Sequence, residues 1–346
     1  MITGAAPLIE TEEDLEEALS RPYPADVDAM RELRGDLMLL GAGGKMGPSL
    51  ARLARRASKQ AGVSRRIIGV SRFSTPGLVQ QLEEGGVETI SCDLLDGDAL
   101  RALPEAPNIL FMTGRKFGST DQEWLTWAMN ALVPALVAER FRRSRIVAFS
   151  TGNVYPLTPV SSGGPTESDP VSPIGEYAQS CLGRERMFQY FSERYGTAAA
   201  LLRLNYAIDL RYGVLHDVAQ KVCNREPIDL SMGHVNVIWQ RDANSVALRA
   251  FAHCCSPPFI LNVTGSEIVS VRWLAQQFGA IFGVEPVFAG AAADTALLSN
   301  ASRCHSLFGP PQASLEQMIR WIARWVELGG RSLGKPTHFE ERDGKF

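Results

Sequence analysis

Three glycines spaced three residues apart, at positions 41, 44 and 47, constrain this chain more than any other feature. An apolar run at 36–40 precedes them, and a segment at 48–59 with apolar residues every three or four positions follows. The pattern predicts a strand, a tight turn and a helix. Glycine lets the backbone approach a ligand closely, and the free N–H groups of a helix start attract an anion. We therefore expect a pyrophosphate at Gly41, Gly44, Lys45, Met46 and Gly47, with an ordinary strand-to-helix loop as the alternative.

Further apolar runs alternate with helix-like segments along the chain. Strands are expected at 67–70, 87–90, 108–112, 145–149, 198–204 and 259–263. The run at 108–112 is apolar almost throughout, as in a strand buried on both faces. This alternation predicts an α/β fold, a Rossmann-type doubly wound parallel sheet with a smaller C-terminal substrate-binding region.

The same pattern divides the chain into regions. Residues 1–35 form an N-terminal helical extension, whose helix begins after Thr11 and is ended by Pro22 and Pro24. Residues 36–205 form the cofactor-binding domain, to which 233–263 return, and residues 206–232 and 264–330 form the substrate-binding region. Residues 331–346 form the tail, and because the chain from 329 to 346 is glycine-rich and charged, we expect it to be loosely held.

Composition excludes several classes of function. The 346 residues carry 35 basic and 38 acidic side chains, so net charge gives no argument for nucleic acid or a membrane surface. The sequence has no apolar run of about eighteen residues and its first residues are acidic, which predicts a cytoplasmic protein. Six scattered cysteines and five histidines without ligand spacing predict reduced, buried thiols and no metal site.

Ser71 and Arg72 follow the second expected strand. In a dinucleotide-binding fold an acidic residue here would bond the ribose 2′-hydroxyl, whereas an arginine accommodates a 2′-phosphate. The pair therefore predicts NADP, with NAD as the alternative if Arg72 is only a solvated surface residue.

Residues near the ends of later strands carry a family resemblance. The sequence is similar to the extended short-chain dehydrogenase/reductase family, the NAD(P)-dependent sugar epimerases and dehydratases. The similarity covers roughly residues 36–328 and rests on the glycine turn together with Asp93, Asn130, Ser150, Thr151, Val154, Tyr155, Tyr177 and Glu185.

The resemblance implies roles for individual residues. Thr151 and Tyr177 hold the substrate oxygen while the nicotinamide takes or gives a hydride. Thr113 and Gly114 flank the cofactor, and Asp93 with Leu94 meets the adenine. Without the resemblance, Thr151 would be interpreted as a strand cap and Tyr177 as a half-buried helix tyrosine.

One position departs from the family pattern of tyrosine, three residues and lysine. The fourth residue after Tyr177 is Cys181. A tyrosine with a pKa of about 10 is ionised to only about one part in a thousand at pH 7, and the family's lysine favours that phenolate.

Three interpretations of this departure remain. Lys116, in the loop after the fourth strand, supplies the cation, unless it is an ordinary loop lysine. Alternatively Tyr177 acts as a neutral proton donor, or the protein binds the dinucleotide without turnover, as a sensor or scaffold. A structural protein with a vestigial fold is a further class.

The resemblance also implies a substrate and a partner. A nucleotide sugar or a related carbonyl or hydroxyl compound would contact Asn205, Arg211 and Arg241, because arginines suit a diphosphate, although each can equally be a surface residue. Many members of the family are homodimers that pair through the helix after the fourth strand and the tyrosine helix.

Overall fold

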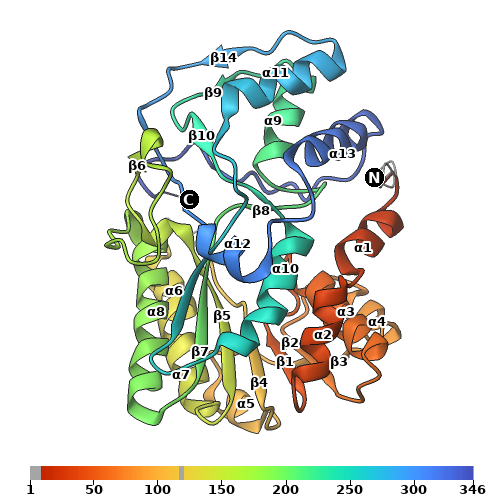
Figure 1. Cartoon of the computed structure of the whole chain (residues 1–346), viewed down its shortest axis with the longest axis vertical. Helices are drawn as coiled ribbons and strands as arrows, with labels where there is room; N and C mark the ends of the chain where they lie inside the picture. The colour runs from red at the N-terminus through yellow and green to blue at the C-terminus, as the bar shows by residue number, and fades with distance from the viewer. Residues whose placement is uncertain (1–8, 117–120, 346) are drawn as a thin grey trace.

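A seven-stranded parallel sheet forms the centre of the molecule. The computed structural model describes residues 9–116 and 121–345. The strands lie in the order β12-β7-β5-β4-β1-β2-β3 (Figure 1). Their bounds are β1 Leu37–Leu40, β2 Ile67–Ser71, β3 Glu88–Ser91, β4 Asn108–Phe111, β5 Arg145–Thr151, β7 Ala199–Leu204 and β12 Phe259–Val263. The predicted doubly wound α/β fold is confirmed, and the topology reverses between β1 and β4.

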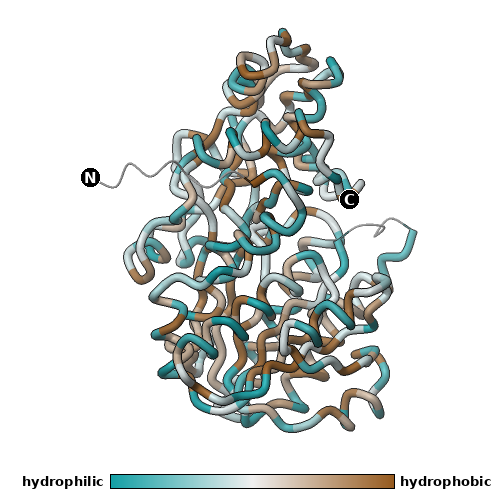
Figure 2. Tube along the Cα trace, turned by 90° about the vertical axis from the view of Figure 1, so that its right-hand side faces the viewer, coloured by the Kyte–Doolittle hydropathy of each residue, from teal (hydrophilic) through white to brown (hydrophobic). Residues whose placement is uncertain are grey.

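Helices cover both faces of the sheet. Leu37 and Leu39 of β1 point into one core, and Met38 and Leu40 point into the other, because successive strand side chains alternate. The first core is closed by α2 (Pro24–Glu32), α3 (Gly47–Gln60) and α10 (Gln240–Arg249), and the second by α5 (Gly97–Ala102), α7 (Val133–Arg140) and α8 (Gly175–Tyr195). Burial on both faces explains why the inner strands β1, β2 and β4 are almost continuously apolar, visible as brown tube in the sheet region (Figure 2).

A second lobe, hereafter the upper lobe, lies above the sheet in Figure 1. It has a hydrophobic core of its own, to which α1 (Glu12–Ser20), α9 (Val214–Cys223), α11 (Val271–Phe282) and α13 (Leu315–Glu327) contribute. The remaining helices are α4 (Leu78–Glu84), α6 (Glu123–Trp127) and α12 (Ser302–Phe308). Short strands pair as β6 (Thr158–Pro159) with β15 (Thr295–Ala296), β8 (Ala207–Ile208) with β11 (Ile238–Trp239), β9 (Ile228–Asp229) with β14 (Phe288–Ala289), and β10 (His234–Val235) with β13 (Val269–Ser270).

Two expectations about the chain's outer segments need correction. Thr11 does cap α1, but Pro24 is the first residue of a second helix, α2, because proline fits the first helical turn, where its missing N–H is not needed. The segment 331–345, hereafter the strap, is not loosely held: Thr337 and Phe339 are each only 1% exposed. Residues 1–8 and 346 of the predicted extension and tail lie outside the described residues.

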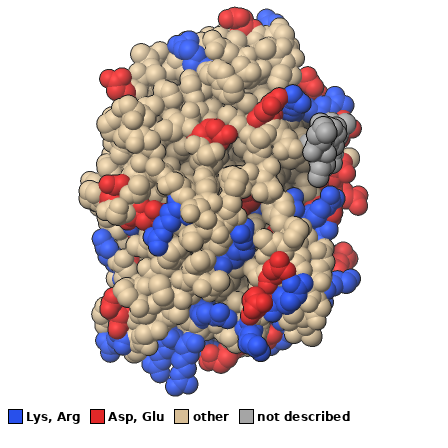
Figure 3. Space-filling view, in the orientation of Figure 1, with Lys and Arg blue, Asp and Glu red and all other residues tan. Residues whose placement is uncertain are grey.

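The surface mixes charges of both signs. Basic and acidic side chains are interspersed over the face drawn in Figure 3. None of the helices in the described part of the chain has the length and apolar character that crossing a membrane requires. All six cysteines are free thiols, and Cys223 and Cys255 are exposed, contrary to the expectation that all would be buried.

A buried ion pair fixes α8 to the sheet. Arg203 of β7 donates from Nη2 to Oε2 of Glu185 at 2.8 Å, with the two side chains 4% and 0% exposed. Ser150 of β5 donates to Oε1 of the same carboxylate at 2.6 Å, and Arg203 Nη1 donates to the Tyr155 hydroxyl at 2.7 Å. Strands β5 and β7 and the helix that carries Tyr177 are therefore joined by one satisfied polar network.

Substituting Arg203→Met should destabilise the protein by about 3 kcal/mol, because it leaves the Glu185 carboxylate buried without its cation. Urea denaturation measures the change. The matched control is Arg320→Met, which removes an exposed pair with Glu316 whose side chains are 72% and 74% exposed. That control substitution should lower the free energy of unfolding by less than about 1 kcal/mol. Equal losses in the two variants would contradict the assignment.

Candidate active site

The glycine turn after β1 is tight enough to require its glycines. Gly41 has φ of +100°, and a Cβ there would lie 2.8 Å from Thr113 Oγ1. A Cβ on Gly47 would lie 2.4 Å from the Ala42 carbonyl oxygen. The turn therefore packs α3 directly on β1 and brings the loop after β4 alongside.

The start of α3 fits an anionic cofactor. Its N-cap residue, Met46, makes no side-chain capping bond, and the first turn holds no acidic side chain. Beside the turn, the buried Thr113 Oγ1 has no hydrogen-bond partner among the described residues. Free N–H groups at a helix start and an orphaned hydroxyl are what a dinucleotide pyrophosphate and its ribose can satisfy. The residues present thus fit NAD or NADP.

Ser71, Arg72, Asp93 and Leu94 meet at the far side of this turn, where β2 and β3 end. The Ser71 hydroxyl crowds Gly43, at 2.6 Å from where a Cβ would stand. Arg72 Nη1 lies 3.8 Å from Asp93 Oδ2, and both side chains are largely exposed. Leu94 is buried in the core beneath them. The structure therefore brings together the predicted adenine and 2′-position residues, but it pairs the arginine with a carboxylate.

Thr151 and Tyr177 lie side by side between the end of β5 and the first turns of α8. Their side chains are close enough to interact, as are the Tyr177 hydroxyl and Cys181, while the Thr151 hydroxyl itself donates to Asn153 Oδ1 at 2.9 Å. Burial raises the pKa of Tyr177 above its ordinary value, with the neighbouring Cys181 adding to the increase. The phenol is therefore protonated, and it is disposed to donate a proton rather than to accept one.

Two cations approach this pair. Lys116 donates from Nζ to the Thr337 carbonyl oxygen at 3.1 Å, and it interacts electrostatically with Cys181. Burial lowers the pKa of Lys116 to about 8. On the other side, Arg184 donates to the Phe149 carbonyl oxygen at 2.8 Å, and its charge opposes the pKa increase at Tyr177. The loop lysine thus stands near the position where the family pattern would place a lysine.

Asn130 holds the loop after β4 in place. It lies in a π-helical segment, Ala128–Leu132, between α6 and α7. Its Oδ1 accepts from the Arg115 backbone N–H at 2.8 Å and from Arg184 Nη2 at 2.9 Å. Its Nδ2 donates to the Arg115 carbonyl oxygen at 2.9 Å and to Ser180 Oγ at 3.0 Å. The residue before Lys116 is therefore fixed relative to α8.

Lys45 does not direct its ammonium toward the place expected for the pyrophosphate at the helix start. Its Nζ donates to the Ala207 carbonyl oxygen at 2.9 Å and lies 3.9 Å from the centre of the Tyr212 ring. Burial lowers its pKa to about 8, and the positive charge of Lys116 contributes to that decrease. The reason is geometric: the turn directs this side chain across to the segment after β7.

The three predicted substrate residues do not converge. Asn205 is buried beside Gly152, at the end of β5. Arg211 is 8% exposed and ion-paired with Asp209, Glu12 and Glu16, so three carboxylates share its charge.

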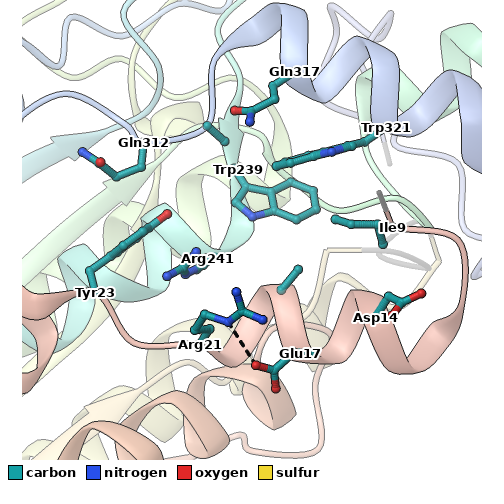
Figure 4. A pocket seen from close by; sticks show the side chains of 12 residues that line it. Ile9, Asp14, Glu17, Arg21, Tyr23, Trp239, Arg241, Gln312, Gln317 and Trp321 are labelled. Carbon is teal, nitrogen blue, oxygen red and sulfur yellow. Dashed lines mark hydrogen bonds and ion pairs between the residues drawn. The ribbon is translucent and has the colours of Figure 1, made fainter. Parts of the chain in front are cut away.

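Arg241 lies elsewhere, in a cavity of about 270 Å³ between α1, α13 and the start of α10 (Figure 4). Its guanidinium stacks over the Tyr23 ring at 3.5 Å. The ring of Trp321 and the Arg21–Glu17 ion pair also border this cavity, so it is separate from the Tyr177 site.

Arg184 and the strap are the site components that sequence reasoning missed. Positions 177, 181 and 184 share one face of a helix, so a cation seven residues after the tyrosine was a usable signal. No comparable signal in the sequence connects Thr337 to Lys116.

Substituting Lys116→Met should give a pH-dependent change in stability. The pKa of this lysine is about 8 in the folded protein and 10.5 ordinarily, so between these values the unfolded chain binds more protons. Stability contributed by Lys116 therefore rises with pH in that window. Urea denaturation should show wild type gaining stability relative to the variant from pH 8 to 10.5. Lys59→Met, on the exposed end of α3, is the control, and a flat difference for Lys116→Met would refute the assignment.

Comparison with known proteins agrees with this fold. A model of the NAD dependent epimerase/dehydratase family matches residues 37–208. No curated protein sequence matches the chain. An epimerase structure from Methanothermobacter thermautotrophicus superposes with a TM-score of 0.71 at 17% identity, covering 88% of this chain and 96% of that one.

Two further structures are similar. UDP-glucose 4-epimerase of Thermotoga maritima, solved with UDP-glucose, gives a TM-score of 0.68 at 16% identity, over 84% of this chain and 98% of that one. UDP-glucuronic acid 4-epimerase of Bacillus cereus, in complex with NAD, gives a TM-score of 0.70 at 15% identity, over 84% of this chain and 98% of that one. The family match shows that residues 37–208, which include the glycine turn and most of the sheet, belong to the NAD dependent epimerase/dehydratase family.

Proposed function

We propose that this chain is an NAD(P)-dependent enzyme of the epimerase, dehydratase or reductase type that acts on a carbonyl or hydroxyl group by hydride transfer. The observation that carries the proposal is the close approach of the Thr151 and Tyr177 side chains, together with a glycine turn whose helix start has no side-chain cap of its own. The similar structures were solved with UDP-glucose or with NAD, so the candidate substrates here are carbonyl and hydroxyl compounds, of which nucleotide sugars are one class.

The cofactor would be held along the edge where the strands end. Backbone groups at Gly41, Gly44 and Gly47 would contact the pyrophosphate, with Thr113 and Gly114 on the nicotinamide side. Ser71, Arg72, Asp93 and Leu94 would border the adenosine. When bound, the nicotinamide supplies or accepts the hydride.

The protein groups handle the substrate oxygen. Thr151 positions that oxygen, and the neutral Tyr177 phenol donates its proton to it as negative charge develops. Lys116 supplies a positive charge beside Cys181, so the phenolate left behind is stabilised. Because burial raises the pKa of Tyr177, this arrangement favours reduction of a carbonyl over oxidation of an alcohol.

A second candidate function is cofactor binding without turnover. The observation in its favour is Cys181, which is fully buried and replaces the family's lysine with an uncharged thiol. A redox-sensing or scaffold protein needs the glycine turn but not the cation.

We also propose a homodimer, formed through α6, the π-helical segment and α8. Large apolar side chains are exposed on these neighbouring elements: Trp124 at 70%, Leu132 at 51% and Tyr190 at 50%. Exposed aromatic residues of this size on adjacent helices are typical of a surface that a partner covers.

Turnover of small carbonyl compounds and nucleotide sugars with NADPH or NADH tests the enzyme proposal. Tyr177→Phe should lower the rate by about 10²- to 10⁴-fold, because the proton donor is lost. Lys116→Ala should reduce activity far more than Lys59→Ala, the exposed control on α3. Equal effects of the two lysine substitutions would remove Lys116 from the mechanism. Cofactor that raises the melting temperature with no turnover of any compound would favour the sensor instead.

Arg72 is proposed to select NADP over NAD. Arg72→Ala should weaken NADP binding about tenfold, equivalent to about 1.4 kcal/mol, and leave NAD binding unchanged, because only NADP carries the 2′-phosphate. Fluorescence titration with both reduced cofactors measures this. The control is Arg66→Ala, because Arg66 is an exposed arginine just before β2, whereas Arg72 directly follows that strand. If Arg72→Ala weakens both cofactors equally, the arginine does not read the 2′ position.

A further inference from the structure

The strap is anchored to the upper lobe along its length. The Thr337 N–H and hydroxyl both donate to Asp217 Oδ2 of α9, at 2.8 and 2.6 Å. Phe339 is buried in the upper-lobe core. Arg342 Nη1 donates to the carbonyl oxygens of Ser231 and Thr295, at 3.0 and 2.8 Å. These contacts fix the strap against the segments predicted to cover the substrate.

The same strap contacts both elements of the candidate active site. The Thr337 carbonyl oxygen accepts from Lys116 Nζ at 3.1 Å. Further along, Gly344 lies against the start of α8, where a Cβ on Gly344 would stand 2.3 Å from the Ile174 carbonyl oxygen. Gly175, the first residue of α8, is equally crowded by Gly344, and Tyr177 is two residues away.

The strap therefore separates the upper lobe from the sheet edge beside the site. In a doubly wound sheet, ligands bind beyond the carboxyl ends of the strands. Lys116 and Tyr177 lie at that edge, and Asp217 lies in the covering lobe. Because the strap contacts Lys116, the start of α8 and Asp217, it lies between the two elements of the candidate site and the covering lobe. In Figure 1 it is the dark blue segment between the two lobes.

The strap also surrounds Lys116 with a carbonyl oxygen and a carboxylate. Lys116 receives a carbonyl oxygen from Thr337 and interacts with the carboxylate of Glu340. Glu340 lies 3.7 Å from Lys221 Nζ as well. A diphosphate at this place would compete with the strap for the same cation and would meet the negative charges of Glu340 and Asp217.

We infer that the strap sets the substrate class: it excludes a nucleoside diphosphate carrier, so the substrate is a small carbonyl or hydroxyl compound. The inference rests on the proposed hydride chemistry at Tyr177 but narrows its substrate. It separates this chain from the UDP-sugar specificity of the similar structures.

Calorimetric titration of the NAD-loaded protein with UDP-glucose tests the inference. Wild type should show no saturable binding. Gly344→Ala should gain it, because the added Cβ displaces the strap from Ile174. Gly334→Ala is the matched control: it has the same kind of positive φ, +62° against +76°, but nothing lies within 4 Å of its added Cβ. This control should behave as wild type.

Thr337→Val, which removes the hydroxyl bond to Asp217 and leaves the backbone one, weakens the strap's anchor at a second point and should also gain binding. Hydrogen exchange of the strap amides verifies displacement, and the melting temperature verifies folding. Saturable UDP-glucose binding to wild type would overturn the inference. So would absence of binding in displaced but folded variants, because the strap would then not be what excludes the nucleotide. If the wild type does not bind NAD, that result contradicts the proposed function and not the role of the strap.

Discussion

The geometry of the candidate site depends on the four hydrogen bonds of Asn130. This fully buried amide uses both lone pairs of its oxygen and both protons of its nitrogen. Its partners belong to the loop after β4 and to α8, so one side chain fixes the distance between the element with Lys116 and the element with Tyr177. The π-helical turn around it directs the amide inward, a use of such turns that is common at functional sites.

Most of the sheet could be predicted from the sequence, because parallel strands buried on both faces leave continuous apolar runs. The helix α2 could not, since proline both ends helices and begins them, and Pro24 was interpreted only as a stop. The order of the strap could not be predicted, for a different reason. Glycine and charge indicate a loose segment, but its order comes from Phe339 and Thr337, whose partners lie far away in the chain.

The residues of the candidate site were predictable where they follow strands, because the ends of parallel strands meet at one edge of the sheet. Thr113 and Thr151 belong to this group. Arg211 shows the opposite case. Its charge suggested a diphosphate, yet its carboxylate partners Glu12 and Glu16 precede it by 199 and 195 residues. Spacing along the chain carries no information about a pair of that kind.

The N-terminal helix α1 also limits how the molecule can move. Glu16 and Glu17 pair with Arg52 and Arg56 of α3 on the sheet side. On the opposite side, Glu10 and Glu12 pair with arginines of the upper lobe, Arg324, Arg211 and Arg331.

These ion pairs of the N-terminal segment 10–17, hereafter the brace, join the two lobes at one place, and the strap joins them at another. A hinge opening of the kind that many two-lobed enzymes use to admit ligands would have to break both ties at once. The two sets of contacts therefore oppose a rigid-body opening of the lobes. Since much of the brace is ionic and partly exposed, dissolved salt loosens it before it disturbs the sheet.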